Sequence, residues 1–342
     1  MNPGKKSPNT ARACLRQMLP PPTVIVSAPS RLHFGLLSFG NPSVRQFGGV
    51  GVMIDQPGLR LKVSPAESLE TAGPLQDRLS EAASRWLENV EDINELRCKV
   101  ELTSIPRLHA GLGVGTQLAL AVATGLNTFY ERSSTGVEAL ARSVGRGLRS
   151  AVGTYGFALG GLIAEQGKLP QESVSPLIER VAMPGEWRFV LIAPKKIEGL
   201  HGANEQSAFD ELPPVAEEVT FRLNGIIMDR ILPAARSANY LGFSDAVYDF
   251  GFLAGSCFAP MQGGAYNGPL LSALVKQIRS LGVRGVGQSS WGPTIYAICE
   301  SKSQADSLAE NLRSLAEDRE YEIMIASADN HGARVTIAAS DL

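Results

Sequence analysis

The spacing of hydrophobic and polar positions predicts both helices and strands along the chain. Between residues 76 and 88, apolar side chains recur every three to four positions, which is the spacing of a helix with one buried face: Leu79, Ala82, Ala83, Trp86 and Leu87. Runs of β-branched and aromatic residues predict strands at 23–28, 31–37, 52–55, 98–105, 187–193, 294–299, 322–326 and 334–338. Further helices are predicted at 215–232, 244–258, 270–281 and 304–316. Pro29 is expected to break the first strand from the second.

The strand predicted at 187–193 also suggests how the chain divides. The chain changes character there to a strong strand that ends at Pro194, so we place a domain boundary just before it and expect domains at 23–184 and 185–342. A length of 342 residues is enough for two domains of ordinary size. Residues 1–22 carry four basic side chains, lack an apolar core and end in three prolines. We expect them to form a disordered leader, not a signal peptide.

Composition excludes several classes of function. The chain is 44% hydrophobic and 19% charged, with a net charge of −2, which gives no reason to expect broad nucleic-acid binding. The four cysteines are scattered and the four histidines lack zinc-ligand spacing. No apolar run reaches the roughly 18 residues of a membrane span. We therefore expect a cytoplasmic protein with reduced cysteines, acting on small molecules without nucleic-acid or membrane partners. A homodimer is also expected, although composition does not indicate the oligomeric state.

A glycine-rich loop before a helix is the main candidate for binding chemistry. Gly111, Gly113 and Gly115 alternate just before a run of good helix formers that begins near Thr116. Glycine leaves room for a ligand, and a helix N-terminus presents free N–H groups and partial positive charge, so this loop, with Thr116 and Gln117, predicts a phosphate site. The alternative is a tight turn into a buried helix. The loop is neither a Walker A motif nor the dinucleotide fingerprint, because the Gly-Lys-Ser/Thr and the third glycine are missing.

Arginines and further glycines provide more candidates in the first half. Arg31 and His33 are two apart, so on a strand they share a face suited to a phosphorylated substrate, although an exposed polar face would look the same. Arg45 precedes Gly48 and Gly49, where close backbone approach or a bulge is expected.

A second group of arginines follows the central helix. Arg142, Arg146 and Arg149 would share one face of a helix, which is usually a solvated face. Six glycines between 145 and 161 argue against one plain helix, however, and a glycine-rich segment with arginines can bind a diphosphate. Of the three, Arg149 is retained as a candidate for contact with the substrate.

Two loops in the second half carry polar side chains. Residues 285–293 form a glycine loop whose Ser289 and Ser290 can donate to phosphate or carboxylate, beside Gln288 and the flat Trp291, although an ordinary turn remains an alternative. His201 and Glu205 lie in the polar loop that follows the 187–193 strand; each is also compatible with a purely structural or solvated position.

Three of these segments resemble the motifs of the GHMP kinase superfamily. The first resemblance is carried by Ala28-Pro29-Ser30-Arg31-Leu32-His33-Phe34-Gly35, the second by Pro106 with Gly111-Leu112-Gly113, and the third by the 285–293 loop. The resemblance implies an α+β fold of two GHMP-type domains, the first like ribosomal protein S5 and the second ferredoxin-like. Kinases of the superfamily usually read Gly-Leu-Gly-Ser-Ser-Ala in the second motif, whereas Val114 and Gly115 replace the serines.

A non-kinase branch, the β-ribofuranosylaminobenzene 5′-phosphate synthase family, is more similar. The similarity extends through Gly48-Gly49-Val50-Gly51, residues 146–161, His201-Gly202-Ala203-Asn204-Glu205 and Gln288-Ser289-Ser290-Trp291-Gly292-Pro293. The chain departs from archaeal members at Ser38 and at 45–49, where they carry aspartates. The resemblance implies a glycosyltransferase (a pentosyltransferase) of tetrahydromethanopterin biosynthesis and one-carbon metabolism. It would join phosphoribosyl diphosphate to 4-aminobenzoate or 4-hydroxybenzoate, releasing pyrophosphate and carbon dioxide.

Such a reaction implies roles for the candidates and for a metal ion. Arg31, His33, Arg45, His201 and Glu205 are expected at the reacting groups, and Mg²⁺ or another divalent cation is expected to arrive on the substrate diphosphate, helped by Glu205 or Asp55. No ATP is expected. Two other functions stay open: an ATP-dependent small-molecule kinase on the same fold, and a binding module without activity.

Overall fold

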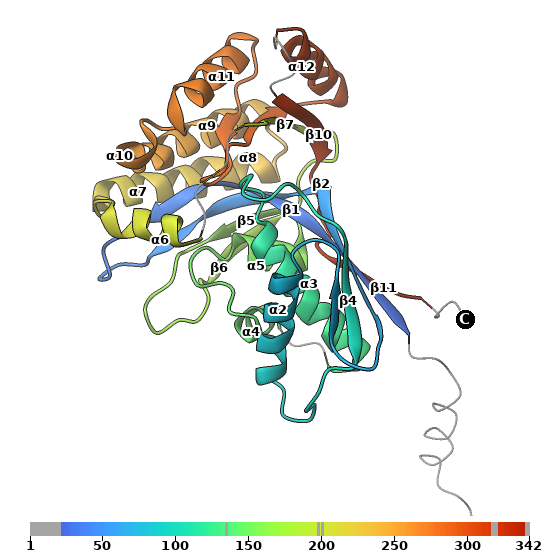
Figure 1. Cartoon of the computed structure of the whole chain (residues 1–342). Coiled ribbons are helices and arrows are strands. Elements are labelled where there is room, and N and C mark those ends of the chain that lie inside the picture. The colour runs from blue at the N-terminus through green and yellow to red at the C-terminus, as the bar shows by residue number, and fades with distance from the viewer. Residues whose placement is uncertain (1–21, 134–135, 197–198, 200–201, 316–320, 339–342) are drawn as a thin grey trace, which may run out of the picture.

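The computed structural model describes residues 22–133, 136–196, 199, 202–315 and 321–338, with only the backbone of 202–206 and 315. The predicted leader lies outside the described residues apart from Pro22. Two sheets and their helices make up the molecule, and the long strands β1 and β2 run between its two halves (Figure 1). In the described part of the chain, no helix combines the length and the apolar character that crossing a membrane requires.

The first sheet has seven strands in the order β11-β1-β2-β4-β3, and β2 also pairs with β5, which pairs with β6. Its pairs are antiparallel except for β3 with β4. The strands span β1 Thr23–Ser38, β2 Phe47–Pro65, β3 Glu70–Ala72, β4 Cys98–Ser104, β5 Leu162–Glu165, β6 Leu177–Val181 and β11 Arg334–Ala338.

Four helices cover this sheet at its lower end in Figure 1: α2 Gln76–Glu88, α3 Val114–Phe129, α4 Val137–Ser143 and α5 Val152–Leu159. The central helix α3 is buried along most of its length, because its sequence is apolar on nearly every side. One core joins it to the sheet and to α2, in which Trp86 is 1% exposed and the Trp86 indole N–H donates to Asn127 at 2.9 Å. The glycine loop is therefore held between a strand, β4, and a buried helix.

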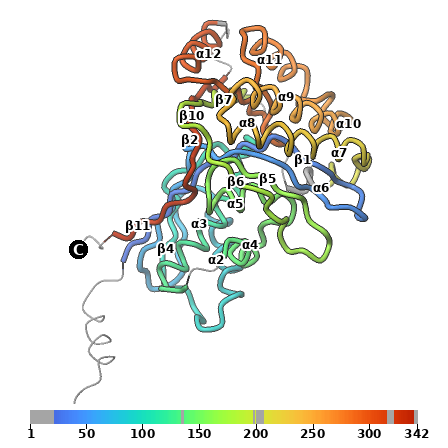
Figure 2. Tube along the Cα trace, turned by 180° about the vertical axis from the view of Figure 1, so that it is seen from behind, coloured from blue at the N-terminus to red at the C-terminus, as the bar shows by residue number. Residues whose placement is uncertain are grey.

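The second sheet has four antiparallel strands in the order β10-β7-β9-β8. Its strands are β7 Arg188–Pro194, β8 Val286–Gln288, β9 Ile295–Cys299 and β10 Tyr321–Ser327. The helices of this half are α6 Gly202–Glu211, α7 Glu217–Ile226, α8 Leu232–Arg236, α9 Tyr240–Ser256, α10 Ala259–Gln262, α11 Gly268–Ser280 and α12 Lys302–Leu315, with a π-helical turn η1 at Ile227–Ile231. Figure 2 shows the same arrangement from behind, with most of these helices above the long strands.

A shared core fixes the two halves against each other. Phe34 of β1 packs 6.5 Å from the ring of Phe243 in α9 and 5.1 Å from the ring of Tyr296 in β9. All three side chains are at most 2% exposed. Burial of large aromatic side chains is the main stabilising term at such a contact, so β1, α9 and β9 are held in fixed relation.

Several sequence expectations need correction. Pro29 does not break β1, because a register shift between Ala28 and Ser30 accommodates it within one continuous strand. At 138–151 the glycine argument against one plain helix agrees with the structure, which has α4, a turn with Gly145 at φ +64°, and then α5 from Val152. The strand β11, which the division at 185 assigned to the second domain, pairs with β1 in the first sheet. The division itself stays a prediction.

Candidate active site

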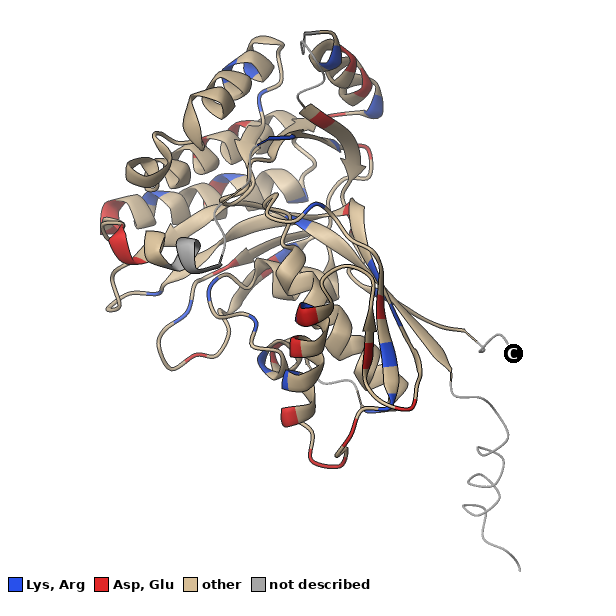
Figure 3. Cartoon of the chain, viewed as in Figure 1, with Lys and Arg blue, Asp and Glu red and all other residues tan. Residues whose placement is uncertain are grey.

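A cavity of about 570 Å³ opens beside the glycine loop. Its walls come from β1, α2, the glycine loop with the start of α3, the 144–150 loop and the 290–292 turn. Five arginines line it, Arg31, Arg78, Arg85, Arg146 and Arg149, whereas Glu81 is the one carboxylate among the described lining residues. Lys and Arg are otherwise spread over both halves and mixed with acidic residues (Figure 3). The cavity is thus a local concentration of positive charge that favours anions.

The N-terminus of α3 faces this cavity. The helix starts at Val114, and Gly113 caps it in the left-handed region at φ +73°. A Cβ on Gly113 would lie 3.2 Å from the Cβ of Arg31. Above Gly115 the nearest atoms are the Arg146 guanidinium nitrogens, 3.9 Å from where a Cβ would be. The start of α3 therefore lines the cavity between Arg31 and Arg146, which is an arrangement suited to an anion.

Ser289, in the 285–293 loop, links this loop to β1 and to the glycine loop before α3. Its hydroxyl donates to the Gly111 carbonyl at 2.7 Å and accepts the backbone N–H of His33 at 3.1 Å. A Cβ on Gly111 would lie 2.1 Å from the Ser289 carbonyl oxygen, so only glycine permits this approach. Ser289 is fully buried and does not line the cavity. Its contacts are therefore those of a structural link between β1 and the two glycine loops.

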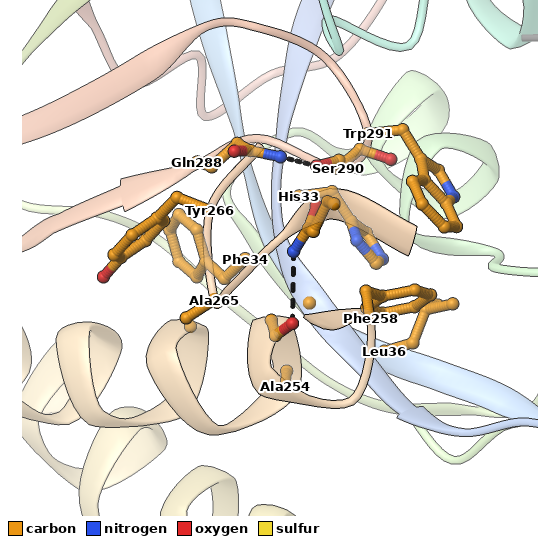
Figure 4. A pocket seen from close by; sticks show the side chains of 14 residues that line it. His33, Phe34, Leu36, Ala254, Phe258, Ala265, Tyr266, Gln288, Ser290 and Trp291 are labelled. Atoms are coloured by element: carbon orange, nitrogen blue, oxygen red, sulfur yellow. Dashed lines mark hydrogen bonds between the residues drawn. The ribbon is translucent and has the colours of Figure 1, made fainter. Parts of the chain in front are cut away.

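A second, smaller pocket of about 50 Å³ adjoins the large cavity. It is mainly apolar, and Figure 4 shows Trp291 and Phe258 on one side and Tyr266 on the other. The Trp291 ring lies 4.6 Å from that of Phe258, nearly edge-on. The Gln288 side chain, which also lines the pocket, accepts the backbone N–H of Asn267 and donates to the Ser290 carbonyl.

Among the described residues, four line both the large cavity and the small pocket: His33, Leu36, Ser290 and Trp291. The junction is fixed by the main chain, because the Ser290 N–H donates to the His33 carbonyl at 3.1 Å, with Ser290 at φ +55°. A charged compartment therefore meets an apolar one at a histidine and a serine.

His33 lies buried at this junction. Its side chain is 3% exposed, and its Nε2 lies 3.1 Å from the Ser150 hydroxyl. Burial, and then the nearby Arg31 charge, hold the pKa of His33 well below its ordinary value. Behind Ser150, the fully buried Glu165 accepts the Ala151 N–H at 2.8 Å, and burial raises the pKa of this carboxyl.

Several predicted site residues lie away from the cavity. Arg45 forms a two-pronged ion pair with Glu172, at 2.6 and 2.9 Å, and donates to the Gly167 carbonyl, so it joins two loops instead of reaching the cavity. The backbone crowding at Gly48 and Gly49 is likewise internal: a Cβ would lie 2.6 Å from Gly167 N and 2.2 Å from the Gly35 carbonyl oxygen, respectively.

Gln117 and Asp55 also have internal partners. The buried Gln117 donates to the Gly153 carbonyl at 2.8 Å and so links α3 to α5. Asp55 accepts the Ser327 N–H at 2.9 Å, where β2 meets β10, and lines neither pocket. His201 and the Glu205 side chain lie outside the described residues. Among the residues whose side chains are described, no cluster of three His, Cys, Asp or Glu could hold a metal ion.

The structure adds three arginines that the sequence reasoning did not assign to the site. Arg78 and Arg85 are seven residues apart, which places them on one face of α2, a signal that the spacing already contained. Arg146 was considered as part of a helix face or of a glycine-rich diphosphate-binding segment, but only Arg149 of that group was retained as a site candidate. Because α4 ends at Ser143 and Gly145 adopts a positive φ, the chain turns and directs Arg146 into the cavity, whereas Arg142 contacts Ser173.

Comparison with known proteins concerns the sequence and the fold of the chain. The family described as GHMP kinases C terminal matches residues 231–318. The β-ribofuranosylphenol 5′-phosphate synthase of Methanothermobacter thermautotrophicus is 28% identical, covering 82% of this chain and 89% of that protein. The enzyme of the same name from Archaeoglobus fulgidus is also 28% identical, covering 90% of this chain and 98% of that protein.

Solved structures agree on the fold. Mevalonate pyrophosphate decarboxylase from Streptococcus pyogenes superposes with a TM-score of 0.69 at 12% identity, covering 91% of this chain and 98% of that one. Homoserine kinase from Cytophaga hutchinsonii gives a TM-score of 0.63 at 16% identity, covering 92% of this chain and 97% of that one. The predicted two-part α+β arrangement is thereby confirmed. The chain has the fold of the GHMP kinases, and along most of its length its sequence is similar to archaeal β-ribofuranosylphenol 5′-phosphate synthases.

Proposed function

We propose that this protein transfers a phosphoribosyl group from phosphoribosyl diphosphate to 4-aminobenzoate or 4-hydroxybenzoate, with loss of carbon dioxide and pyrophosphate. The observation that carries the proposal is the meeting of an arginine-lined cavity with a small apolar pocket at His33, Ser290 and Trp291. A phosphorylated donor suits the first compartment and an aromatic acceptor the second. The names of the archaeal relatives, which denote a ribosyl phosphate joined to a phenol, support the same reaction.

The donor would bind along the glycine loop. Its diphosphate would accept N–H groups from the start of α3, next to Arg31, where charge-assisted hydrogen bonds are short and strong. Val114 stands where kinases of this fold carry a serine near the phosphates, which removes a hydroxyl from the site. That substitution favours release of a diphosphate over transfer of a phosphoryl group from ATP.

The acceptor would lie across the junction. The small pocket, at about 50 Å³, has room for a few water molecules. It is too small for a whole benzene ring, which binds in a cavity of about 150 Å³. One edge of the ring would therefore enter the pocket near Tyr266 and Phe258, while the carbon that bears the carboxylate faces the large cavity. Trp291 would bound the ring, with its own orientation fixed by Phe258.

At this junction the reaction would proceed by displacement. The ring carbon that bears the carboxylate bonds to ribose C1 as the bond from C1 to diphosphate breaks. The carboxylate then leaves as carbon dioxide, and its bonding electrons restore the aromatic ring. Arginines and helix amides stabilise the charge that develops on the diphosphate. The lowered pKa of His33 favours its neutral form, which would not place a competing cation beside the electron-rich ring, and the apolar walls would limit access of water to C1.

A divalent cation is also proposed, carried by the diphosphate. The described side chains do not form a metal cage, and the one described carboxylate in the cavity, Glu81, is 2.7 Å from Arg85. Mg²⁺ often binds mainly through substrate phosphates and retains several waters, and it would supply charge neutralisation on the leaving group. Activity should be lost in EDTA and recovered with added magnesium.

The test is one mixture of purified protein, magnesium, phosphoribosyl diphosphate and carboxyl-labelled aromatic acid. Labelled carbon dioxide and pyrophosphate should appear together, and only when both substrates are present. A parallel mixture with ATP and small alcohols tests the kinase alternative, which the fold of homoserine kinase keeps open. ATP turnover without any release of carbon dioxide would contradict the proposal and favour the kinase.

A further inference from the structure

The far end of the large cavity, beneath α2, contains a group of arginines with no assigned role. Arg78 and Arg85 reach it from α2, and Arg146 reaches it from the 144–150 loop. Glu81, the one described carboxylate in the lining, pairs with Arg85 across one helical turn at 2.7 Å. Three guanidinium groups thus share a single counter-charge among the described lining residues.

The backbone of the loop brings these side chains together. Gly145 adopts φ +64°, and a Cβ there would lie 2.6 Å from Nη1 of Arg85, so the guanidinium of Arg85 rests against the loop backbone. The next residue, Arg146, extends toward the start of α3, where its nitrogens come within 3.9 Å of the position a Gly115 Cβ would take. Arg146 therefore lies between the α2 arginines and the helix N-terminus.

The charges at this end are only partly compensated. Burial, and then the charge of Arg85, lower the pKa of Arg146, and the buried Nε of Arg146 has no hydrogen-bond partner among the described residues. Like charges this close repel one another, and burial of an unpaired donor is unfavourable. A bound anion would remove both penalties.

We propose that Arg78, Arg85 and Arg146 form a second anion subsite that binds a phosphate group separate from the diphosphate on the same ligand. The inference rests on the proposed function, since it assigns the 5-phosphate of the sugar to this end and the diphosphate to the N-terminus of α3. The ligand class is therefore a pentose that carries a diphosphate on C1 and a monophosphate on C5.

The orientation follows from the position of the junction. Ribose C1 must face His33 and Ser290, and the glycine loop lies beside them, because Ser289 bonds to both Gly111 and His33. The diphosphate on C1 then occupies the near subsite, and the 5-phosphate points away from the junction toward α2. The aromatic side chains of the cavity lining, Phe209 and Trp291, contact each other at 5.6 Å beside the junction, so the α2 end presents guanidinium groups and not a stacking surface.

Calorimetric titration of the full chain with two probes, ribose 5-phosphate and pyrophosphate, tests the proposal. Wild type should bind both at once, so that saturating ribose 5-phosphate changes the pyrophosphate Kd by less than about threefold. The variants Arg78→Gln and Arg85→Gln should weaken ribose 5-phosphate by about tenfold or more and pyrophosphate by less than about threefold, because each charge-assisted bond to phosphate is strong. Arg85→Lys should weaken ribose 5-phosphate binding less than Arg85→Gln does, because lysine keeps the positive charge.

The matched control is Arg142→Gln, which removes a nearby arginine that contacts Ser173 outside the cavity and should change neither Kd. Thermal unfolding of each variant verifies that it is folded. Mutually exclusive binding of the two probes, or equal losses for both probes in the α2 variants, would overturn the second subsite while leaving phosphoribosyl transfer intact. Failure of wild type to bind either probe would contradict both proposals.

Discussion

Replacing Gly115 by alanine should separate the stability of the protein from its ability to bind anions. Gly115 is the second residue of α3, and its φ lies outside the left-handed region. The nearest atoms to an added methyl group are the Arg146 nitrogens at 3.9 Å, an ordinary van der Waals distance. The fold therefore accepts the methyl group, but the methyl group occupies space that the proposal assigns to a phosphate.

The expected magnitudes have opposite signs. Alanine is more favourable than glycine by about 0.5–1 kcal/mol in a helix interior, and by less in a first turn, so Tm should rise by about 1–3 °C. Loss of one charge-assisted hydrogen bond from a backbone amide should cost about 1.5–3 kcal/mol of binding, which is roughly 10- to 100-fold in Kd. Differential scanning calorimetry and titration with pyrophosphate measure the two quantities.

Gly225→Ala is the matched control. Gly225 lies in α7 and lines neither pocket, and an added Cβ would meet only Asp229 Oδ2 at 3.8 Å. This variant should gain stability in the same way and bind pyrophosphate as wild type does. The assignment of the anion to the start of α3 would be refuted if Gly115→Ala bound pyrophosphate with the wild-type Kd.

Three further variants test other parts of the site. Arg45→Met should lower Tm slightly and leave turnover unchanged, because Arg45 pairs with Glu172 away from the cavity; a large loss of turnover in a folded variant would return Arg45 to the active site. Gln117→Leu should lower the unfolding free energy by about 1–3 kcal/mol, since the buried Gly153 carbonyl loses its donor, without changing the pyrophosphate Kd; an unchanged stability would mean that this bond is dispensable. The pKa of His33 is lowered in the folded state, so below its ordinary value of 6.5 the unfolded chain takes up a proton that the folded chain does not, and stability should fall as pH falls. His33→Asn should flatten that part of the pH profile of unfolding, and an identical profile in the variant would show that His33 does not titrate as inferred.

The sequence predicted most of the elements because local pattern and tertiary structure agree there. The helix expected at 76–88 is α2, residue for residue, since its apolar stripe packs on the core. Strands at 98–105 and 187–193 fell within one residue of β4 and β7 at each end. The predicted strand break at Pro29 was wrong, because tertiary contacts decide the structure there. The pairing of β1 with β2 and β11 keeps β1 continuous through Pro29.

The candidate site was predicted in part for the same reason. Arg31, His33 and the glycine loop could be grouped from spacing and local motifs, and the structure brings them to one cavity. Arg45 and Gln117 could not be excluded, because their partners Glu172 and Gly153 are distant in sequence. Arg146 could not be assigned, because its direction depends on the turn at Gly145. The direction of a side chain that follows a turn depends on the backbone conformation of that turn, so residue type alone does not predict it.

A crystal structure of the full chain with phosphoribosyl diphosphate tests the central claim most directly, namely that the arginine-lined cavity binds a phosphorylated pentose diphosphate. The account predicts diphosphate oxygens about 3 Å from the first amides of α3 and from Arg31, with the 5-phosphate among Arg78, Arg85 and Arg146 and ribose C1 facing His33. A ligand bound outside this cavity, or bound in it with the diphosphate away from the start of α3, would contradict the account.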